Sequence, residues 1–135
     1  MTTIEIQMLG ASILLGFVHL FLAATAATKQ RGKAWNIGTR EGPTAPLTGT
    51  AFRLDQAFEN FKETFPFFAA AVLAVQASQR WSMLTVLGVH LYFWGRVAYL
   101  PVYAFGINYV RTLVWIVATG GILLLVLALF SNWPT

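Results

Sequence analysis

Hydrophobic residues fill four long stretches of this chain, and polar residues gather between them. Each stretch holds about twenty residues or more, which is the length that an α-helix needs to cross a bilayer core. The pattern predicts four membrane-spanning helices, at residues 7–28, 50–77, 81–103 and 109–130. Because the connections are short, residues 1–135 are predicted to form a single all-α integral membrane domain, a bundle of four transmembrane helices.

Composition supports the membrane class, since 57% of the residues are hydrophobic and only 10% are charged. Soluble domains carry roughly 25% charged residues. The net charge of +4 would suggest nucleic-acid binding in a soluble protein. It comes almost wholly from one cluster in the first polar loop, formed by Lys29, Arg31, Lys33 and Arg40. Basic loops stay in the cytoplasm, so both chain termini are predicted on the non-cytoplasmic side, and no nucleic-acid partner is expected.

The chain has no cysteine, so any thiol chemistry needs a thiol from a substrate or cofactor. His19 and His90 lie in separate apolar spans, and neither has a second ligand at a suitable spacing. They are interpreted as core or interface histidines, and no metal site is predicted.

The second span begins with a charged segment, RLDQAFENFKETFPF, at residues 53–67. Its five charged side chains would each cost at least about 2.5 kcal/mol if they faced lipid. They are therefore expected to face a bundle interior or a polar cavity. At 100° per residue they form two neighbouring stripes. The first contains Arg53, Gln56, Asn60 and Glu63, and the second contains Asp55, Glu59 and Lys62. Together they cover about half of the helix circumference, which favours a trimer or a cavity between subunits.

The third and fourth spans bring further polar groups to the same membrane face. Tyr92, Arg96, Tyr99 and Tyr103 follow each other at helical spacing along the third span, and Arg111 opens the fourth. Three arginines at similar depth are expected to meet two or three carboxylates. The result would be a nearly neutral site that holds an anionic ligand.

An alternative explains the charges by pairing alone. Glu59 with Lys62, or Glu63 with an arginine, would form ion pairs that make membrane burial tolerable, and Arg111 would extend to the lipid headgroups. We prefer a functional site, because four packed helices gain nothing from so many charges at membrane depth.

Several of these residues together resemble the MAPEG superfamily, the membrane-associated proteins of eicosanoid and glutathione metabolism. The matching elements are Asn60-x-x-Glu63-x-x-Pro66, Arg96-x-x-Tyr99-x-x-x-Tyr103 and Arg111. The resemblance covers essentially the whole chain. It is closest to a bacterial branch distinct from those with established eicosanoid or detoxification activity, which implies the bacterial inner membrane.

The resemblance implies a homotrimer that binds glutathione between neighbouring subunits near the cytoplasmic face. Arg53 and Asn60 would bind or support the tripeptide, and Glu63 would hold its amino end. The pocket would be lined by Arg96, Tyr99 and Tyr103. Arg111 would be catalytic and stabilise the glutathione thiolate, because a guanidinium stays protonated and lowers the pKa of a thiol.

Two functions remain open. The first is a glutathione-dependent transferase or peroxidase that acts on lipophilic substrates from the bilayer, and Tyr99 and Arg111 favour it. The second is a non-catalytic membrane protein that binds a lipid or another anion in the same pocket. Gln56 and Phe58 favour the second, because active branches usually have an arginine and often a histidine at these places. A small transporter is disfavoured, because no internal repeat is visible.

Overall fold

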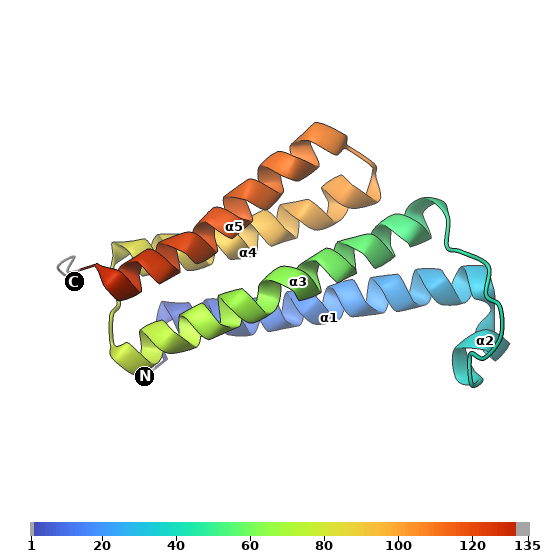
Figure 1. Ribbon diagram of the computed structural model, residues 1–135, viewed down its shortest axis with the longest axis horizontal. Coiled ribbons are helices and arrows are strands. Elements are labelled where there is room, and N and C mark those ends of the chain that lie inside the picture. Colours follow the sequence, from blue (N-terminus) through green and yellow to red (C-terminus); the bar gives the residue numbers. More distant parts are fainter. Residues whose placement is uncertain (1, 132–135) are drawn as a thin grey trace.

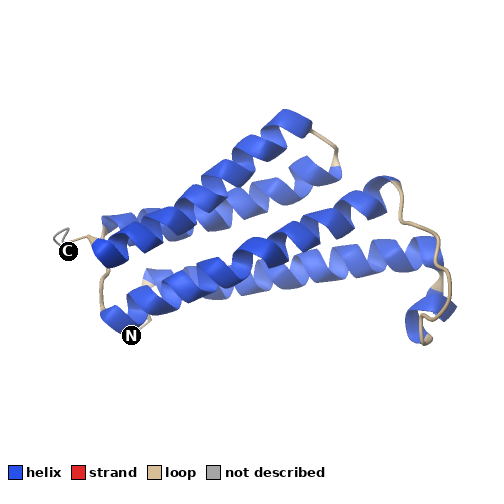
Figure 2. Ribbon diagram, in the orientation of Figure 1, coloured by secondary structure: helices blue, strands red, loops and turns tan. Residues whose placement is uncertain are grey.

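The computed structural model describes residues 2–131, which fold into four long helices and one short helix. Figures 1 and 2 show each long helix running antiparallel to the next one along the chain, with loops between them. The helices are α1 Ile4–Arg31, α2 Lys33–Ile37, α3 Gly49–Ser78, α4 Met83–Ala104 and α5 Asn108–Phe130. The start of α1 and the end of α5 lie at one end of the bundle, and α2 lies at the other (Figure 1).

The largest difference from the predicted spans is at α1, which extends three residues further at each end than residues 7–28. Thr3 caps its start by accepting a hydrogen bond from the Ile6 amide at 3.3 Å. Gly32, with φ of 96°, ends it. The first polar segment was interpreted as a loop throughout, and α2 corrects that interpretation. The guanidinium carbons of Arg31 and Arg40 each lie 4.7 Å from the centroid of its Trp35 ring. The hydrophobic pattern of the segment does not predict these contacts.

Three of the helices, α1, α4 and α5, are long and apolar enough to cross a membrane. The fourth long helix, α3, has 30 residues and carries the charged segment in its first half. It packs against α1, α4 and α5, and these contacts can keep charged side chains away from lipid.

The α4 and α5 helices form the most extensive helix pair, and small residues allow their backbones to approach closely. A Cβ atom on Gly88 would lie 2.7 Å from the Gly121 carbonyl oxygen. A Cβ atom on Gly95 would lie 2.9 Å from the Cβ of Ala118. Glycine is therefore needed on both of these turns of α4.

Packing is unequal along the bundle. The larger hydrophobic cluster fills the half near the chain termini, where the rings of Phe68 and Tyr92 stack at 4.0 Å between centroids. A smaller cluster around Ala57, Tyr99 and Leu100 occupies the opposite half. There the first turns of α5 are largely exposed, with Tyr109 at 93%. The loosely packed half is also the half that holds the predicted polar residues.

Candidate functional site

The deepest polar group of this half is the Arg96 guanidinium, which is completely buried on α4. Its Nη1 donates a hydrogen bond of 2.7 Å to Oδ1 of Asn60 on α3. Its Cζ lies 4.1 Å from the centroid of the Tyr99 ring. Within the described chain, Nε and Nη2 have no hydrogen-bond partner. Because a buried donor without an acceptor is costly, these two groups indicate where a ligand or water would bind.

A recess of about 170 Å³ opens beside Asn60 and Tyr99. The first turns of α5 supply its other wall, with Arg111, Thr112 and Trp115. Arg111 and Trp115 are four residues apart, which is about one helical turn, so both side chains lie on the same face of α5.

A second recess, of about 210 Å³, lies at the α4–α5 connection and also includes Arg111. Tyr103 and Arg53 line it, and the Arg111 guanidinium carbon lies 5.0 Å from the Tyr103 ring centroid. Arg53 reaches across from α3 and donates from Nε to the Ala104 carbonyl at 2.8 Å. Arg111 is therefore the side chain that the two recesses share.

The ion pairs expected at a nearly neutral site are not seen within the described residues of the single chain. Across residues 2–131, no carboxylate lies within ion-pair distance of Arg53, Arg96 or Arg111. The observed ion pair joins Lys62 and Glu59 at 2.6 Å, and both side chains are about half exposed. This is the pairing that the alternative interpretation expected, but it does not involve any of the three arginines.

Helix geometry explains the missing neutralisation. Asp55, Glu59 and Lys62 face a different cavity, on the side of α1 and α2. Glu63 is exposed on the surface of the single chain. The polar residues of α3 thus line cavities on two separate sides of the helix. The width of the polar arc alone therefore does not require a trimer.

The matching elements of the sequence now have a common structural setting. Asn60 and Arg96 are bonded to each other, and Tyr99, Tyr103 and Arg111 line adjoining recesses. The model of the MAPEG family matches residues 8–131. The chain belongs to the MAPEG family. Neither a curated protein nor a solved structure matches it at a significant level.

Membership of the MAPEG family confirms the resemblance, and with the apolar helices it makes this chain an integral membrane protein. The all-helical bundle agrees with that assignment. The family match covers α3 together with the three more apolar helices, so the charged segment belongs to the membrane bundle.

Sequence reasoning missed part of the wall in this MAPEG-family protein. Trp115 and Asn108 line the recesses, and neither is among the predicted site residues. The spacing of Trp115 from Arg111 was the available signal for the first. Among the predicted residues, Glu63 and Arg96 line neither recess within one chain, although Arg96 is hydrogen-bonded to Asn60 in the wall of the first.

The two histidines lie outside the recesses. His19 is buried, and its ring stacks on Phe61 at 4.9 Å between centroids. His90 accepts a hydrogen bond of 3.3 Å from the Trp94 indole through Nδ1. In residues 2–131, no group of three or more His, Asp or Glu side chains is arranged to hold a metal ion.

Proposed function

We propose that this MAPEG-family protein binds glutathione at the Arg111 recesses and uses its thiolate as a transferase or peroxidase on lipophilic substrates. The observation that carries the proposal is that Arg53 and Arg111 line adjoining recesses without a carboxylate partner in the described chain. The buried Arg96 lies behind the wall of the first recess, in contact with Asn60 and Tyr99. Glutathione presents two carboxylates and a thiol, so it offers the negative charge that these guanidinium groups lack.

The arginines divide naturally into two roles. Arg96 is held by Asn60 and keeps two donors free, which suits a fixed position for a carboxylate. Arg111 is only partly buried and is shared by both recesses, which suits contact with the reacting sulfur. A guanidinium beside a thiol lowers its pKa, and the thiolate is the nucleophile in either reaction.

A second candidate function is non-catalytic binding of a lipid or another anion in the same recesses. Gln56 and Phe58 support it, because they replace an arginine and a histidine of the active branches. Phe58 packs instead toward α1, with its ring 6.4 Å from that of His19. This function needs the cationic site but no activated thiol.

We propose a homotrimer in which a neighbouring subunit closes the site. The recesses hold about 170 and 210 Å³, whereas small-molecule pockets usually enclose about 300–1,000 Å³. The exposed Glu63 would then face a neighbour and remain available for the amino group of glutathione. Native mass measurement of protein in mild detergent should give a mass of three chains. A dominant monomer or dimer would contradict the shared site.

We also propose that the recesses face the cytoplasm of a bacterial inner membrane. They lie at the end of the bundle that carries the basic cluster Lys29, Arg31, Lys33 and Arg40. Since the chain has no cysteine, Thr2→Cys introduces a single reactive thiol. It should react with an impermeant maleimide added outside intact spheroplasts. Labelling only after permeabilisation would reverse the topology.

The binding step is tested by calorimetric titration of glutathione into purified protein in lipid nanodiscs. Arg111→Ala should weaken binding by about tenfold or more, because hydrogen bonds to charged groups contribute about 1.5–3 kcal/mol. The matched control is Arg80→Ala, which removes an exposed arginine at the opposite end, where it donates to the Ser131 carbonyl at 2.7 Å. Equal affinities of both variants would exclude Arg111 from the site.

A further inference from the structure

A separate groove runs between α1 and α3, on the opposite side of α3 from the arginine recesses. It has two adjoining compartments, which we call the apolar and polar compartments of the α1–α3 groove. They share Leu20, Phe58 and Lys62 as common wall residues. The shared wall makes them parts of one continuous groove.

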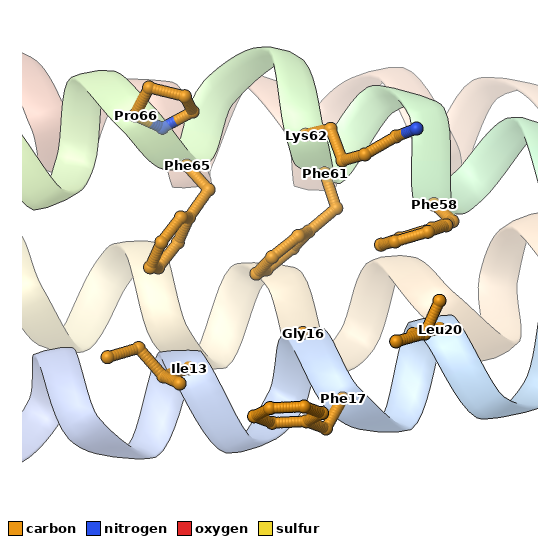
Figure 3. A pocket seen from close by; sticks show the side chains of 9 residues that line it. All are labelled: Ile13, Gly16, Phe17, Leu20, Phe58, Phe61, Lys62, Phe65 and Pro66. Atoms are coloured by element: carbon orange, nitrogen blue, oxygen red, sulfur yellow. The ribbon is translucent and has the colours of Figure 1, made fainter.

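The apolar compartment encloses about 460 Å³, within the range of small-molecule pockets. Figure 3 shows the rings of Phe58, Phe61 and Phe65 extending from α3 toward α1. Gly16 on α1 lets the Phe61 ring approach the α1 backbone closely, since a Cβ atom at this position would lie 3.0 Å from that ring. Phe17 is half exposed at the edge, so the compartment opens sideways onto the bilayer. An alkyl chain is the chemical group that suits this space.

The polar compartment encloses about 270 Å³ at the end that carries α2. Arg31 and Arg40 each place a guanidinium carbon 4.7 Å from the centroid of the Trp35 ring. The buried Trp35 Nε1 has no acceptor among the described residues. In the same part of the chain, no carboxylate lies within ion-pair distance of Arg31 or Arg40. Nε and Nη2 of Arg31 donate to the Ala45 carbonyl, and those of Arg40 donate to Asn36. The compartment therefore offers an acceptor group the Trp35 indole N–H and the remaining Nη1 groups of the two arginines.

The charges of this wall favour an anion. Three cations line it, Arg31, Arg40 and Lys62, against the carboxylates of Asp55 and Glu59. Lys62 is already paired with Glu59 at 2.6 Å, which leaves the two arginines against Asp55 and an excess of one positive charge. Phosphate and carboxylate groups are the usual partners of paired guanidinium groups.

We propose that the α1–α3 groove binds a membrane amphiphile, with its anionic head at Arg31, Trp35 and Arg40 and one alkyl chain in the apolar compartment. The order of the compartments supports a lipid, because the polar one lies at the helix ends and the apolar one lies deeper along the spans. A phospholipid and a fatty acid share this chemistry. A second copy of the chain would not need a cationic compartment continuous with an apolar one.

The test uses native mass spectrometry of delipidated protein with added phosphatidylglycerol, phosphatidylcholine or palmitate. One anionic amphiphile should bind per chain, at least about tenfold more tightly than phosphatidylcholine. Binding of phosphatidylglycerol alone would identify a phospholipid site, and binding of palmitate alone a fatty-acid site. Equal binding of phosphatidylcholine would overturn the proposal.

Matched variants locate the bound molecule. The double variant Arg31→Gln with Arg40→Gln should weaken binding about tenfold or more, whereas Lys29→Gln with Lys33→Gln removes two charges outside the groove and should not. Leu20→Trp should obstruct the junction of the compartments, while Leu14→Trp, at an exposed position outside the groove, should not. Equal losses in test and control variants would contradict the site.

A final variant examines whether another subunit covers the groove. Phe17→Cys places the chain's single cysteine at its edge. If the groove holds a lipid, this thiol should react with a lipid-soluble maleimide and form little disulfide between chains. Complete oxidation to a disulfide-linked dimer would show that a second copy covers the groove, and the proposal would fail.

Discussion

Gly121→Ala is expected to separate α4 from α5 and to lower the melting temperature in detergent. The added Cβ would lie 2.5 Å from the Gly88 carbonyl oxygen and 2.8 Å from the Tyr92 amide nitrogen. Both neighbours are backbone atoms, so no side chain can rotate away and the helices must move. Overpacking of this kind costs about 1–3 kcal/mol, and a backbone contact belongs at the upper end.

The adjacent glycine provides the control for this change. A Cβ atom on Gly120 meets nothing within 4 Å, so Gly120→Ala should leave the melting temperature unchanged. Because Arg96 and Arg111 lie on the two helices of this pair, Gly121→Ala should also weaken glutathione binding. Identical melting of both variants would show that α4 and α5 do not approach this closely.

Arg96→Met is expected to abolish high-affinity binding of glutathione while leaving the ligand-free protein as stable as before, or more stable. Arg96 is completely buried, and two of its nitrogens lack partners in the described chain. A buried charge without a carboxylate partner is costly to desolvate, so replacing it by an apolar side chain of similar size removes that cost. The lost hydrogen bond to Asn60 would offset part of that gain.

This variant distinguishes a ligand-binding arginine from a structural one. An arginine kept for packing would, on substitution, lower the melting temperature and leave glutathione affinity unchanged. Thermal unfolding measured with and without glutathione gives both quantities in one experiment. Asn60→Leu is a useful companion, because it should weaken binding by removing the acceptor that holds Arg96 in place.

Three of the long helices, α1, α4 and α5, could be predicted because each is an apolar stretch long enough to cross a bilayer. The charged first half of α3 could be predicted from the helical spacing of its polar residues. The short helix α2 could not, since its Trp35 is held by Arg31 and Arg40 from outside the helix. Its five residues are too few for a stable isolated helix, so its stability depends on contacts with the side chains that flank it.

The site could be predicted in part. Helical spacing placed Arg96, Tyr99 and Tyr103 along one side of α4, and Asn60 meets Arg96 from α3. The charge balance could not be predicted, because spacing alone does not say which partner each stripe of α3 faces. Glu63 turned out to be exposed, and Asp55 and Glu59 line the α1–α3 groove. Counting arginines and carboxylates at equal membrane depth therefore overestimated how many ion pairs the arginines form within one chain.

The most direct test of the proposed function is the ultraviolet thiolate absorbance of glutathione titrated into the protein at neutral pH. Free thiols have a pKa of about 8.5 and are mostly protonated under this condition. We expect a thiolate band that saturates with binding, is absent with S-methylglutathione, and is lost in Arg111→Ala. Saturable glutathione binding without a thiolate band would contradict the catalytic proposal and leave an anion-binding membrane protein.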